Sequence, residues 1–276
     1  MTSVGCLLCV AWLFLGLVSL MDHHTLNLGA LFGRAWVRRI EHHESLDSTN
    51  QFAIEMLASE PQLPALVVAD EQTAGRGRGG NEWWSPTGAL LFSIAIKRTE
   101  DAAELPPYSL MAGLAVCDVL QKQSQAEVEF KVKWPNDVYL EGRKVCGILV
   151  EIPPNHRDTL VVGIGVNLNN SVSDAPEELK QRMTSMLDIH GHTFCRTTTL
   201  GDIAYQIVQG VRASAFANLP ERWEPHCWLT GKKVSIQQGD NTLTGTCTGI
   251  NASGAILLQT ETGQVAASSG VVTEIA

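Results

Sequence analysis

The sequence has little positive charge and lacks the common nucleotide-binding patterns. Its 276 residues include 20 Lys and Arg against 29 Asp and Glu, a net charge of -9. Non-specific nucleic-acid binding needs an excess of Lys and Arg on one face to neutralise phosphates, so the composition argues against that class. There is no GxxxxGK followed by Ser or Thr, and no GxGxxG followed by an acidic residue on a next strand. The absence of internal repeats and low-complexity tracts argues against a solenoid or a disordered chain.

The first 21 residues carry no charge, in a chain whose overall composition suits one large and one small globular domain. A helix over the apolar residues 4–20 would span about 25 Å, against ~30 Å of hydrocarbon. No Lys or Arg precedes it, as one would in a secretory signal. Three interpretations stay open for this start of the predicted leader and linker, residues 1–43: a dispensable or misassigned leader before Met21, an N-terminal anchor that would contact a membrane, or a signal peptide.

The cysteines and histidines do not predict a metal site. Cys6 and Cys9 have CxxC spacing, but no His or second CxxC lies nearby. The histidine pairs are neighbours in sequence and lack the i,i+4 spacing of helical metal ligands. We therefore expect no structural metal, and reduced, buried thiols typical of a cytosolic protein. The seven cysteines are Cys6, Cys9, Cys117, Cys146, Cys195, Cys227 and Cys247.

Two segments stand out as candidate binding elements. Ser48 and Gln51 have capping-box spacing, which predicts a helix whose first residues present a polar cluster, with simple capping as the alternative. Residues 75–81 read GRGRGGN, a segment with little drive to fold alone. Its backbone N–H groups and two arginines suit an anion. A flexible surface loop and an arginine–glycine nucleic-acid segment are the alternatives, and the net charge counts against the second.

Alternating residues between positions 128 and 134 predict a strand with one apolar side. A hairpin turn at Glu141–Gly142 leads to strands over 145–152 and 159–168, which predicts an antiparallel meander. We expect an α+β fold: a mixed or antiparallel sheet with helices on one face, and an open face that presents Lys131, Lys133 and Lys144. Further strands are predicted at 66–69 and 89–96, and helices at 105–123, 176–190 and 199–218.

Glycine-punctuated, β-rich runs after Cys227 predict a small C-terminal β-barrel. The predicted division is a leader and linker at 1–43, an α+β domain at 44–226 and the small β-barrel at 227–276. The barrel has no Lys or Arg after Lys233, so we do not expect basic contacts from its far end to a phosphate ligand.

Five motifs occur in a fixed order: STN at 48–50, EQTAGRGRGGNEWWSPTG at 71–88, KWPND at 133–137, GRKVCGILVE at 142–151 and GIGVNL at 163–168. This ordered set resembles the biotin protein ligases, from about Ser45 to Ala276. The resemblance implies a core like that of the class II aminoacyl-tRNA synthetases and biotin/lipoate ligases, with a biotin/ATP catalytic domain at 44–226 and an SH3-like barrel at 227–276. About 44 residues precede the first motif, too few for a DNA-binding domain, so the chain resembles the monofunctional members and no nucleic-acid partner is expected.

The resemblance implies that biotin and ATP, with Mg, give biotinyl-5'-adenylate, and that biotin then passes to a lysine of a biotin carboxyl carrier protein or domain. The implied catalytic residues are Lys144, Arg78 and Arg76. Asp137 is either a Mg contact or a turn cap. The implied biotin-binding residues are Ser48, Thr49, Asn50, Gln72, Gly75, Arg76, Arg78, Trp134, Lys144 and Gly147. The implied ATP-binding residues are Arg76, Arg78, Trp83, Asn136, Asp137, Lys144, Gly165 and Asn167.

Two alternatives stay open: a lipoate- or octanoate-type protein ligase, and a non-catalytic biotin-sensing module. The implied substrates are cytosolic, so we expect a cytoplasmic protein in which residues 1–21 are not a working export signal. Exposed sheet edges predict that a homodimer can form. A further hypothesis is that residues 75–81 fold over the adenylate and shield it from water.

Overall fold

The computed structural model describes residues 26–32, 35–98, 105–213, 216 and 218–275. The predicted leader, with Cys6 and Cys9, lies outside the described residues. Within those residues, no helix is both long enough and apolar enough to cross a membrane.

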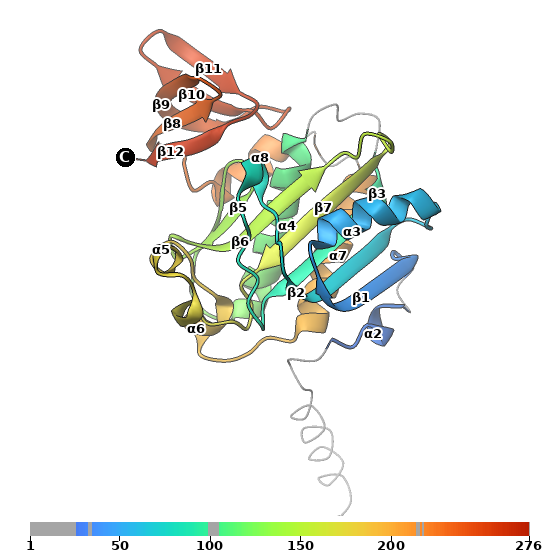
Figure 1. Ribbon diagram of the computed structural model, residues 1–276. Coiled ribbons are helices and arrows are strands. Elements are labelled where there is room, and N and C mark those ends of the chain that lie inside the picture. The colour runs from blue at the N-terminus through green and yellow to red at the C-terminus, as the bar shows by residue number, and fades with distance from the viewer. Residues whose placement is uncertain (1–25, 33–34, 99–104, 214–215, 217, 276) are drawn as a thin grey trace, which may run out of the picture.

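A seven-stranded mixed sheet forms the larger part of the molecule (Figure 1). The order of its strands is β1-β2-β3-β7-β6-β5-β4. The pair β1–β2 is parallel and all other pairs are antiparallel, so β4 to β7 form the predicted meander. The strands are β1 (Arg39–Leu46), β2 (Ala65–Gln72), β3 (Leu90–Lys97), β4 (Phe130–Lys133), β5 (Asp137–Leu140), β6 (Arg143–Glu151) and β7 (Thr159–Val166).

The edge strand β1 has no counterpart among the predicted strands. Its sequence, RIEHHESL, has only two strongly apolar residues, and most of its side chains are partly or fully exposed. A polar, charged edge strand is a common way to prevent pairing with another chain, but it removes the alternation by which strands are recognised. The predicted domain boundary at residue 44 falls inside β1, and the domain limits otherwise stay a prediction.

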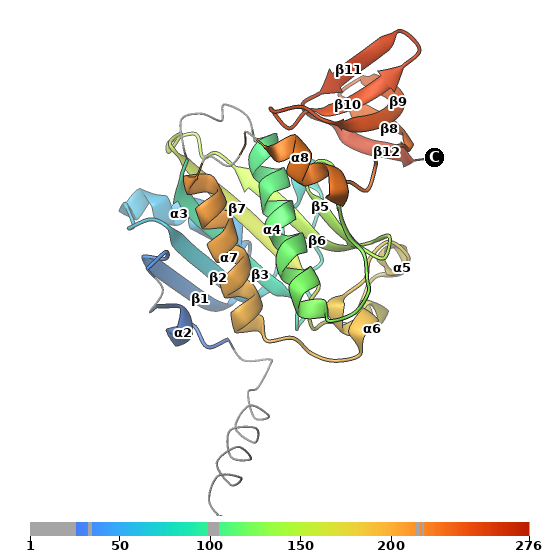
Figure 2. The same ribbon diagram turned by 180° about the vertical axis from the view of Figure 1, so that it is seen from behind.

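Helices cover both faces of this sheet. The long α4 (Pro106–Ser124) and α7 (Arg196–Arg212) lie together on one face (Figure 2). The prediction of helices on one face only was wrong, because a second apolar cluster forms on the opposite face of the sheet. The short α3 (Thr49–Met56) lies on the other face, over β2, β3 and β7. Strand β2 serves both layers, because alternate residues point to opposite faces: Leu66 and Val68 join the core under α4 and α7, while Ala65 and Val67 join the cluster under α3.

The remaining helices are short. The predicted helix at 176–190 is two helices separated by residues 181–185, and the helix predicted at 199–218 begins earlier and ends earlier, as α7. The short elements are α2 (Gly29–Phe32), η1 (Leu57–Ser59), η2 (Arg78–Gly80), η3 (Val172–Asp174), α5 (Glu177–Lys180), α6 (Met186–His190), α8 (Leu219–Trp223) and η4 (Glu224–His226).

The C-terminal domain is a five-stranded antiparallel sheet in the order β11-β10-β9-β8-β12, which confirms the small SH3-like unit. Two hydrogen bonds join it to the larger sheet: Trp228 N donates to Val132 O at 3.0 Å, and Trp134 Nε1 donates to Gly254 O at 3.0 Å. Its strands are β8 (Lys233–Gln238), β9 (Asn241–Ile250), β10 (Ile256–Thr260), β11 (Gly263–Ala267) and β12 (Val271–Ile275).

Candidate active site

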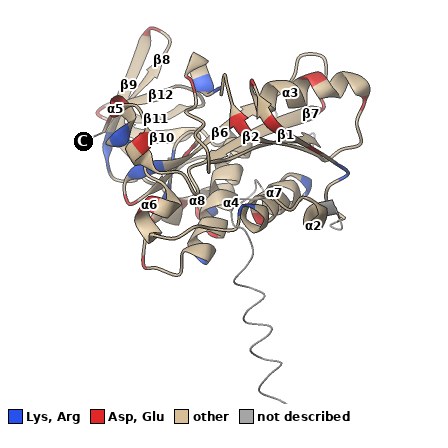
Figure 3. Cartoon of the chain, turned by 60° about the horizontal axis from the view of Figure 1, so that its bottom comes forward, with Lys and Arg blue, Asp and Glu red and all other residues tan. Residues whose placement is uncertain are grey.

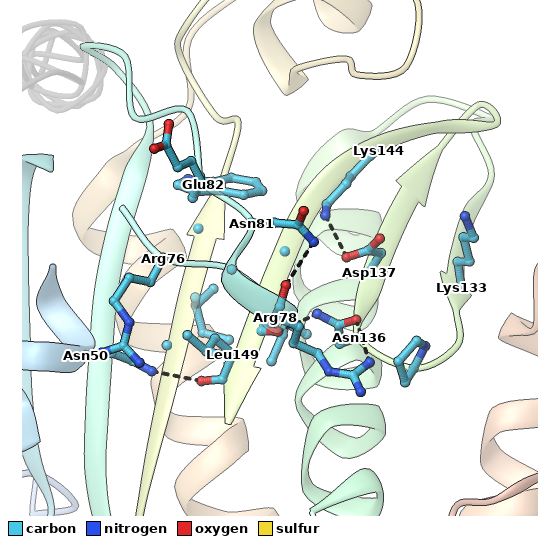
Figure 4. A pocket seen from close by; sticks show the side chains of 18 of the residues that line it. Asn50, Arg76, Arg78, Asn81, Glu82, Lys133, Asn136, Asp137, Lys144 and Leu149 are labelled. Atoms are coloured by element: carbon cyan, nitrogen blue, oxygen red, sulfur yellow. Dashed lines mark hydrogen bonds and ion pairs between the residues drawn. The ribbon is translucent and has the colours of Figure 1, made fainter. Parts of the chain in front are cut away.

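One pocket brings together the N-terminus of α3, the glycine loop (residues 75–81), the β4–β5 turn and the middle of β6 and β7. Its volume is about 170 Å³, below the ~300–1,000 Å³ of typical ligand pockets. Figure 4 shows its labelled side chains ordered across the site as Asn50 and Arg76, then Arg78 and Asn136, then Asp137, Lys144 and Lys133.

The start of α3 forms a buried polar end of the pocket. Ser48 caps the helix by accepting a hydrogen bond from Gln51 N. Thr49 donates to Gln72 Oε1 from its backbone N at 2.8 Å and from its hydroxyl at 3.1 Å. Ser93 Oγ, from β3, lies 2.7 Å from the Thr49 hydroxyl and shares its single proton between that oxygen and Asn50 Oδ1. Each side chain is held by a neighbour, so the end of the pocket is organised to bind a neutral group through short hydrogen bonds.

Asn50 occupies the adjoining position on the same helix turn. Its Nδ2 donates to Leu149 O at 3.1 Å and to Glu151 Oε2 at 2.8 Å, and its Oδ1 accepts from Ser93 Oγ at 2.6 Å. The amide lies directly over Gly163, where any Cβ would overlap Asn50 Oδ1. With these bonds Asn50 connects β6 to β3, so it supports the polar end of the pocket from below.

The glycine loop crosses the open side of the pocket as a tight turn. Gly77 N donates to Asn81 O at 2.7 Å, and Trp83 N donates to Gly75 O at 2.8 Å. Gly79 has a backbone φ of +65°, a conformation that residues other than glycine rarely adopt. Gly75 is required for packing instead, because a Cβ there would lie 2.6 Å from Trp83 O.

The two arginines of this loop point to different ends of the pocket (Figure 4). Arg76 donates to Gln51 Oε1 at 2.9 Å and forms an ion pair with Glu151. Arg78 is hydrogen-bonded to Asn136 Oδ1 at 3.5 Å. Burial lowers the pKa of Arg78 and nearby Asp137 opposes this, but a guanidinium stays charged in proteins. Of the two predicted catalytic arginines, Arg78 therefore lies nearer to the β4–β5 turn. We call the end of the pocket at this turn the cationic end.

Lys144 and Lys133 supply positive charge at that end. Lys144 Nζ lies 2.7 Å from Asp137 Oδ1. Burial lowers the pKa of Lys133, Asp137 opposes the shift, and Lys144 and Arg182 add to it. Lys133 was predicted on the open face of the sheet but not as a site residue, and it lines the pocket. Figure 3 shows blue segments of basic residues close to α5 and the C-terminal strands in that view.

The Trp83 ring lies over two glycines that face each other across β6 and β7. Gly147 and Gly165 are register partners. A Cβ on Gly147 would lie 2.7 Å from the Trp83 ring, and one on Gly165 would lie 2.5 Å from it. Trp83 Nε1 is buried and has no hydrogen-bond partner. The glycines thus form a flat floor for one aromatic ring, and the ring occupies part of the space that was predicted to hold ligand.

Two predicted binding residues, Asn167 and Gly75, lie outside the pocket lining. Asn167 is fully buried: its amide donates to Thr184 O at 3.0 Å and accepts from Asn170. Gly75 packs against Trp83 O. Trp134 lines the pocket but is only 1% exposed, and its indole N–H donates to Gly254 O of the C-terminal domain. The ligand contacts of all three stay predictions.

Some lining residues gave no recognisable signal in the sequence. The C-terminal domain contributes Gly270, Val271 and Val272, from the start of β12, to the wall of the pocket. Ser93 had one usable signal, because it is the only polar residue inside the apolar run of β3. Glu151 ends a recognised motif, but its bonds to Arg76 and Asn50 depend on a loop and a helix far away in the sequence.

The class that this fold and pocket define is the biotin/lipoate A/B protein ligase family, which matches residues 43–169. The biotin protein ligase C-terminal domain matches residues 230–273. The chain belongs to the biotin protein ligase family, on the basis of these matches and of the relatives described next.

Two curated relatives and one solved structure illustrate the similarity. The bifunctional ligase/repressor BirA of Bacillus subtilis is 30% identical over 228 residues, which cover 80% of this chain and 70% of the relative. The biotin–acetyl-CoA-carboxylase ligase of Paracoccus denitrificans is 31% identical over 224 residues, covering 79% and 93%. The biotin protein ligase from Aquifex aeolicus in complex with biotin and ATP superposes with a TM-score of 0.73, at 30% identity, covering 87% of this chain and 98% of that one.

Proposed function

We propose that this chain activates biotin with ATP and transfers it to a lysine of a biotin carboxyl carrier protein or domain. The observation that carries the proposal is one pocket with a neutral hydrogen-bonding end at Ser48, Thr49 and Gln72 and a cationic end at Lys144 and Arg78. Biotin has a neutral ureido ring at one end and a carboxylate at the other, which suits this polarity. The C-terminal domain match favours biotin over lipoate as the substrate.

In the first step, a carboxylate oxygen of biotin bonds to the α-phosphorus of ATP, and the bond to pyrophosphate breaks. Two anions must approach each other, and negative charge grows on the phosphoryl oxygens. Lys144 and Arg78 are positioned to offset that charge, and fixed cations in a partly dry site stabilise it more strongly than water does. In the second step, the acceptor amine bonds to the acyl carbon, AMP leaves and the amine releases a proton.

Magnesium enters this scheme with the nucleotide. Mg²⁺ bound to phosphates needs only one or two protein carboxylates, and it would neutralise phosphate charge. Two carboxylates line the pocket, those of Asp137 and Glu82. In the part of the chain that the structure describes, no group of three or more His, Cys, Asp or Glu could hold a metal alone. A Mg²⁺ carried mainly by ATP, with Asp137 as a protein contact, fits these residues.

The proposed function is tested with purified protein, ATP, Mg²⁺, labelled biotin and a carrier domain. We expect label on the acceptor lysine, and none with lipoate in place of biotin. Labelling with lipoate alone would identify a lipoate-type ligase, and adenylate without transfer would identify a biotin-sensing module. We also propose that the protein acts in the cytoplasm, where ATP and the carrier are found; a homodimer stays a prediction.

Trp83 is expected to stack on the adenine, so displacing it should weaken nucleotide binding. The added methyl group of Gly165→Ala would meet the ring at 2.5 Å. Base–aromatic stacking contributes about 1–3 kcal/mol, so Kd for ATP should rise about tenfold, as measured by calorimetry. In a Trp83→Ala background the same substitution should add little, because the clash is gone. Additive losses in the double variant would show that the methyl group acts on the ligand directly.

The glycine loop should become protected when ligands bind. Most residues of this loop are exposed or partly exposed, and its backbone makes few hydrogen bonds. Arg76 and Arg78 should therefore be good trypsin sites in the free protein. With biotin and ATP present, cleavage at these arginines should slow at least about tenfold if the loop orders over the adenylate. Cleavage after Arg157, in the exposed turn between β6 and β7, is the internal control and should not change. Equal cleavage at all sites in both conditions would rule out the ordering.

A further inference from the structure

Four buried cysteines form two close pairs, and the proposed chemistry uses neither. Cys117 and Cys146 lie near each other in the core of the larger domain. Cys227 lies at the start of the C-terminal domain and Cys247 lies in β9, and a hydrogen bond joins their side chains. All four are free thiols. The two pairs share burial and proximity, so differences in their surroundings decide whether either is reactive.

Backbone N–H groups surround the sulfur of Cys227. Its Sγ accepts hydrogen bonds from Leu229 N and Thr230 N, each at 3.2 Å. The same turn is tied to Cys247, because Gly231 N donates to Cys247 O and Cys247 N donates to Lys232 O, both at 2.9 Å. Successive N–H groups that point at one atom favour negative charge on it. The turn therefore holds the two sulfurs together and stabilises a thiolate on Cys227.

The pKa shifts of the thiols differ between the two pairs for this reason. Burial raises the pKa of Cys227, but hydrogen bonds from Cys247, from Thr230 and from the backbone outweigh it and lower the pKa below its ordinary value. The hydrogen bond to Cys227, together with burial, raises the pKa of Cys247. Burial raises the pKa of both Cys117 and Cys146. Thiolate character is thus concentrated on Cys227, with a protonated thiol beside it.

We propose that Cys227 and Cys247 form a peroxide-reactive dithiol that closes to a disulfide. The Cys227 thiolate attacks one oxygen of hydrogen peroxide, the O–O bond breaks, and the departing hydroxide takes up a proton to leave as water. The sulfenic acid formed is then attacked by the Cys247 sulfur, and its hydroxyl leaves as a second water with the thiol proton. Two thiols are oxidised as one peroxide is reduced. Cys227 is 8% exposed, and Thr230, whose backbone N donates to its sulfur, is exposed, so the thiol lies close to the surface where a small oxidant can reach it.

Two stacked aromatic rings connect the Cys227–Cys247 pair to the pocket. Trp228 follows Cys227 and stacks on Tyr139, with 4.5 Å between ring centroids. Lys133 Nζ lies 5.5 Å from the Tyr139 ring and 5.7 Å from the Trp228 ring, and Lys133 lines the pocket. A disulfide that draws Cys227 toward β9 acts on this stack. Resting on the proposed function, it should raise KM for ATP several-fold more than it changes kcat.

The test of the dithiol itself does not depend on ligase activity. The full chain is exposed to hydrogen peroxide, free thiols are blocked with N-ethylmaleimide, and peptides are mapped by mass without reduction. We expect a cross-linked peptide pair that contains Cys227 and Cys247, has lost two hydrogen atoms and reverts with dithiothreitol. Cross-linking should be at least about tenfold faster than at Cys117 and Cys146, the matched internal pair, because those thiols stay protonated.

Two variants separate the roles of the sulfurs. Cys247→Ser should stop the reaction at a sulfenic acid on Cys227, which dimedone traps, whereas Cys227→Ser should abolish both products. If either variant fails to fold, the comparison between the two pairs in the unmodified chain still decides. Peroxide that leaves Cys227 unmodified, or that cross-links Cys117 and Cys146 equally fast, would overturn the proposal. An unchanged KM for ATP in the oxidised protein would remove only the link to the pocket.

Discussion

Lys144→Ala should lower the rate of biotinyl-adenylate formation by about 10²–10³-fold, the usual effect of removing one group that stabilises transition-state charge. The reason lies in the geometry of the cationic end. Lys144 Nζ is fixed 2.7 Å from Asp137 and 5.4 Å from the centre of the Trp83 ring. It therefore lies beside the ring that is predicted to stack on adenine, from where we expect it to reach the α-phosphate. The measurement is single-turnover pyrophosphate release at saturating ATP and biotin.

Lys131→Ala is the matched control for this prediction. Lys131 lies on the adjacent strand β4, but its Nζ is engaged by Pro225 O and Glu129, and it does not line the pocket. Its replacement should change the adenylation rate less than about twofold, as expected for a partly exposed ion pair. Similar losses in both variants would mean that general positive charge, and not the position of Lys144, drives the first step. A full adenylation rate in Lys144→Ala would refute the catalytic assignment.

Local signals explain why much of this fold could be predicted. The Ser48 cap and the Glu141–Gly142 turn each depend on a few neighbouring residues, and both occur, the turn with φ values of 50 and 75. The alternation of buried Phe130 and Val132 with partly exposed neighbours is likewise local. Strand β1 was not predicted, because its charged sequence has no apolar alternation. Its parallel partner is also not adjacent in sequence, since β2 begins 26 residues after the start of β1.

The site was predictable as a set of motifs but not as a network of bonds. A motif identifies residues that meet at one place, but it cannot say whether a polar group faces the ligand or the protein. Asn167 and Trp134 belong to recognised motifs, yet their polar atoms bond to Thr184 O and Gly254 O. Conversely, Lys133 lines the pocket because the turn at Pro135 directs β4 toward Asp137. The bonds of Asn167 and Trp134 follow from packing between distant segments, which no local pattern contains.

Gly163→Ala should be the most damaging small substitution for stability. The added Cβ would overlap Asn50 Oδ1, which accepts the hydrogen bond of buried Ser93. Overpacking costs about 1–3 kcal/mol, and a buried group left without its partner costs about 1–3 kcal/mol more. We therefore expect the free energy of unfolding to fall by about 2–6 kcal/mol, as measured by denaturant titration. Biotin affinity should fall as well, because Asn50 supports the end formed by Thr49.

Gly113→Ala provides the comparison, because the same methyl group is added where it fits. Gly113 lies inside α4, and its Cβ would lie 3.2 Å from a Val132 methyl group, a contact that a small shift relieves. Alanine is favoured over glycine within helices by up to about 1 kcal/mol, so stability should change by less than about 1 kcal/mol in either direction. If Gly163→Ala lowered the free energy of unfolding as little as Gly113→Ala, the hydrogen bonds between Asn50 and Ser93 would have to rearrange freely. The polar end of the pocket would then not be the rigid support that its short bonds indicate.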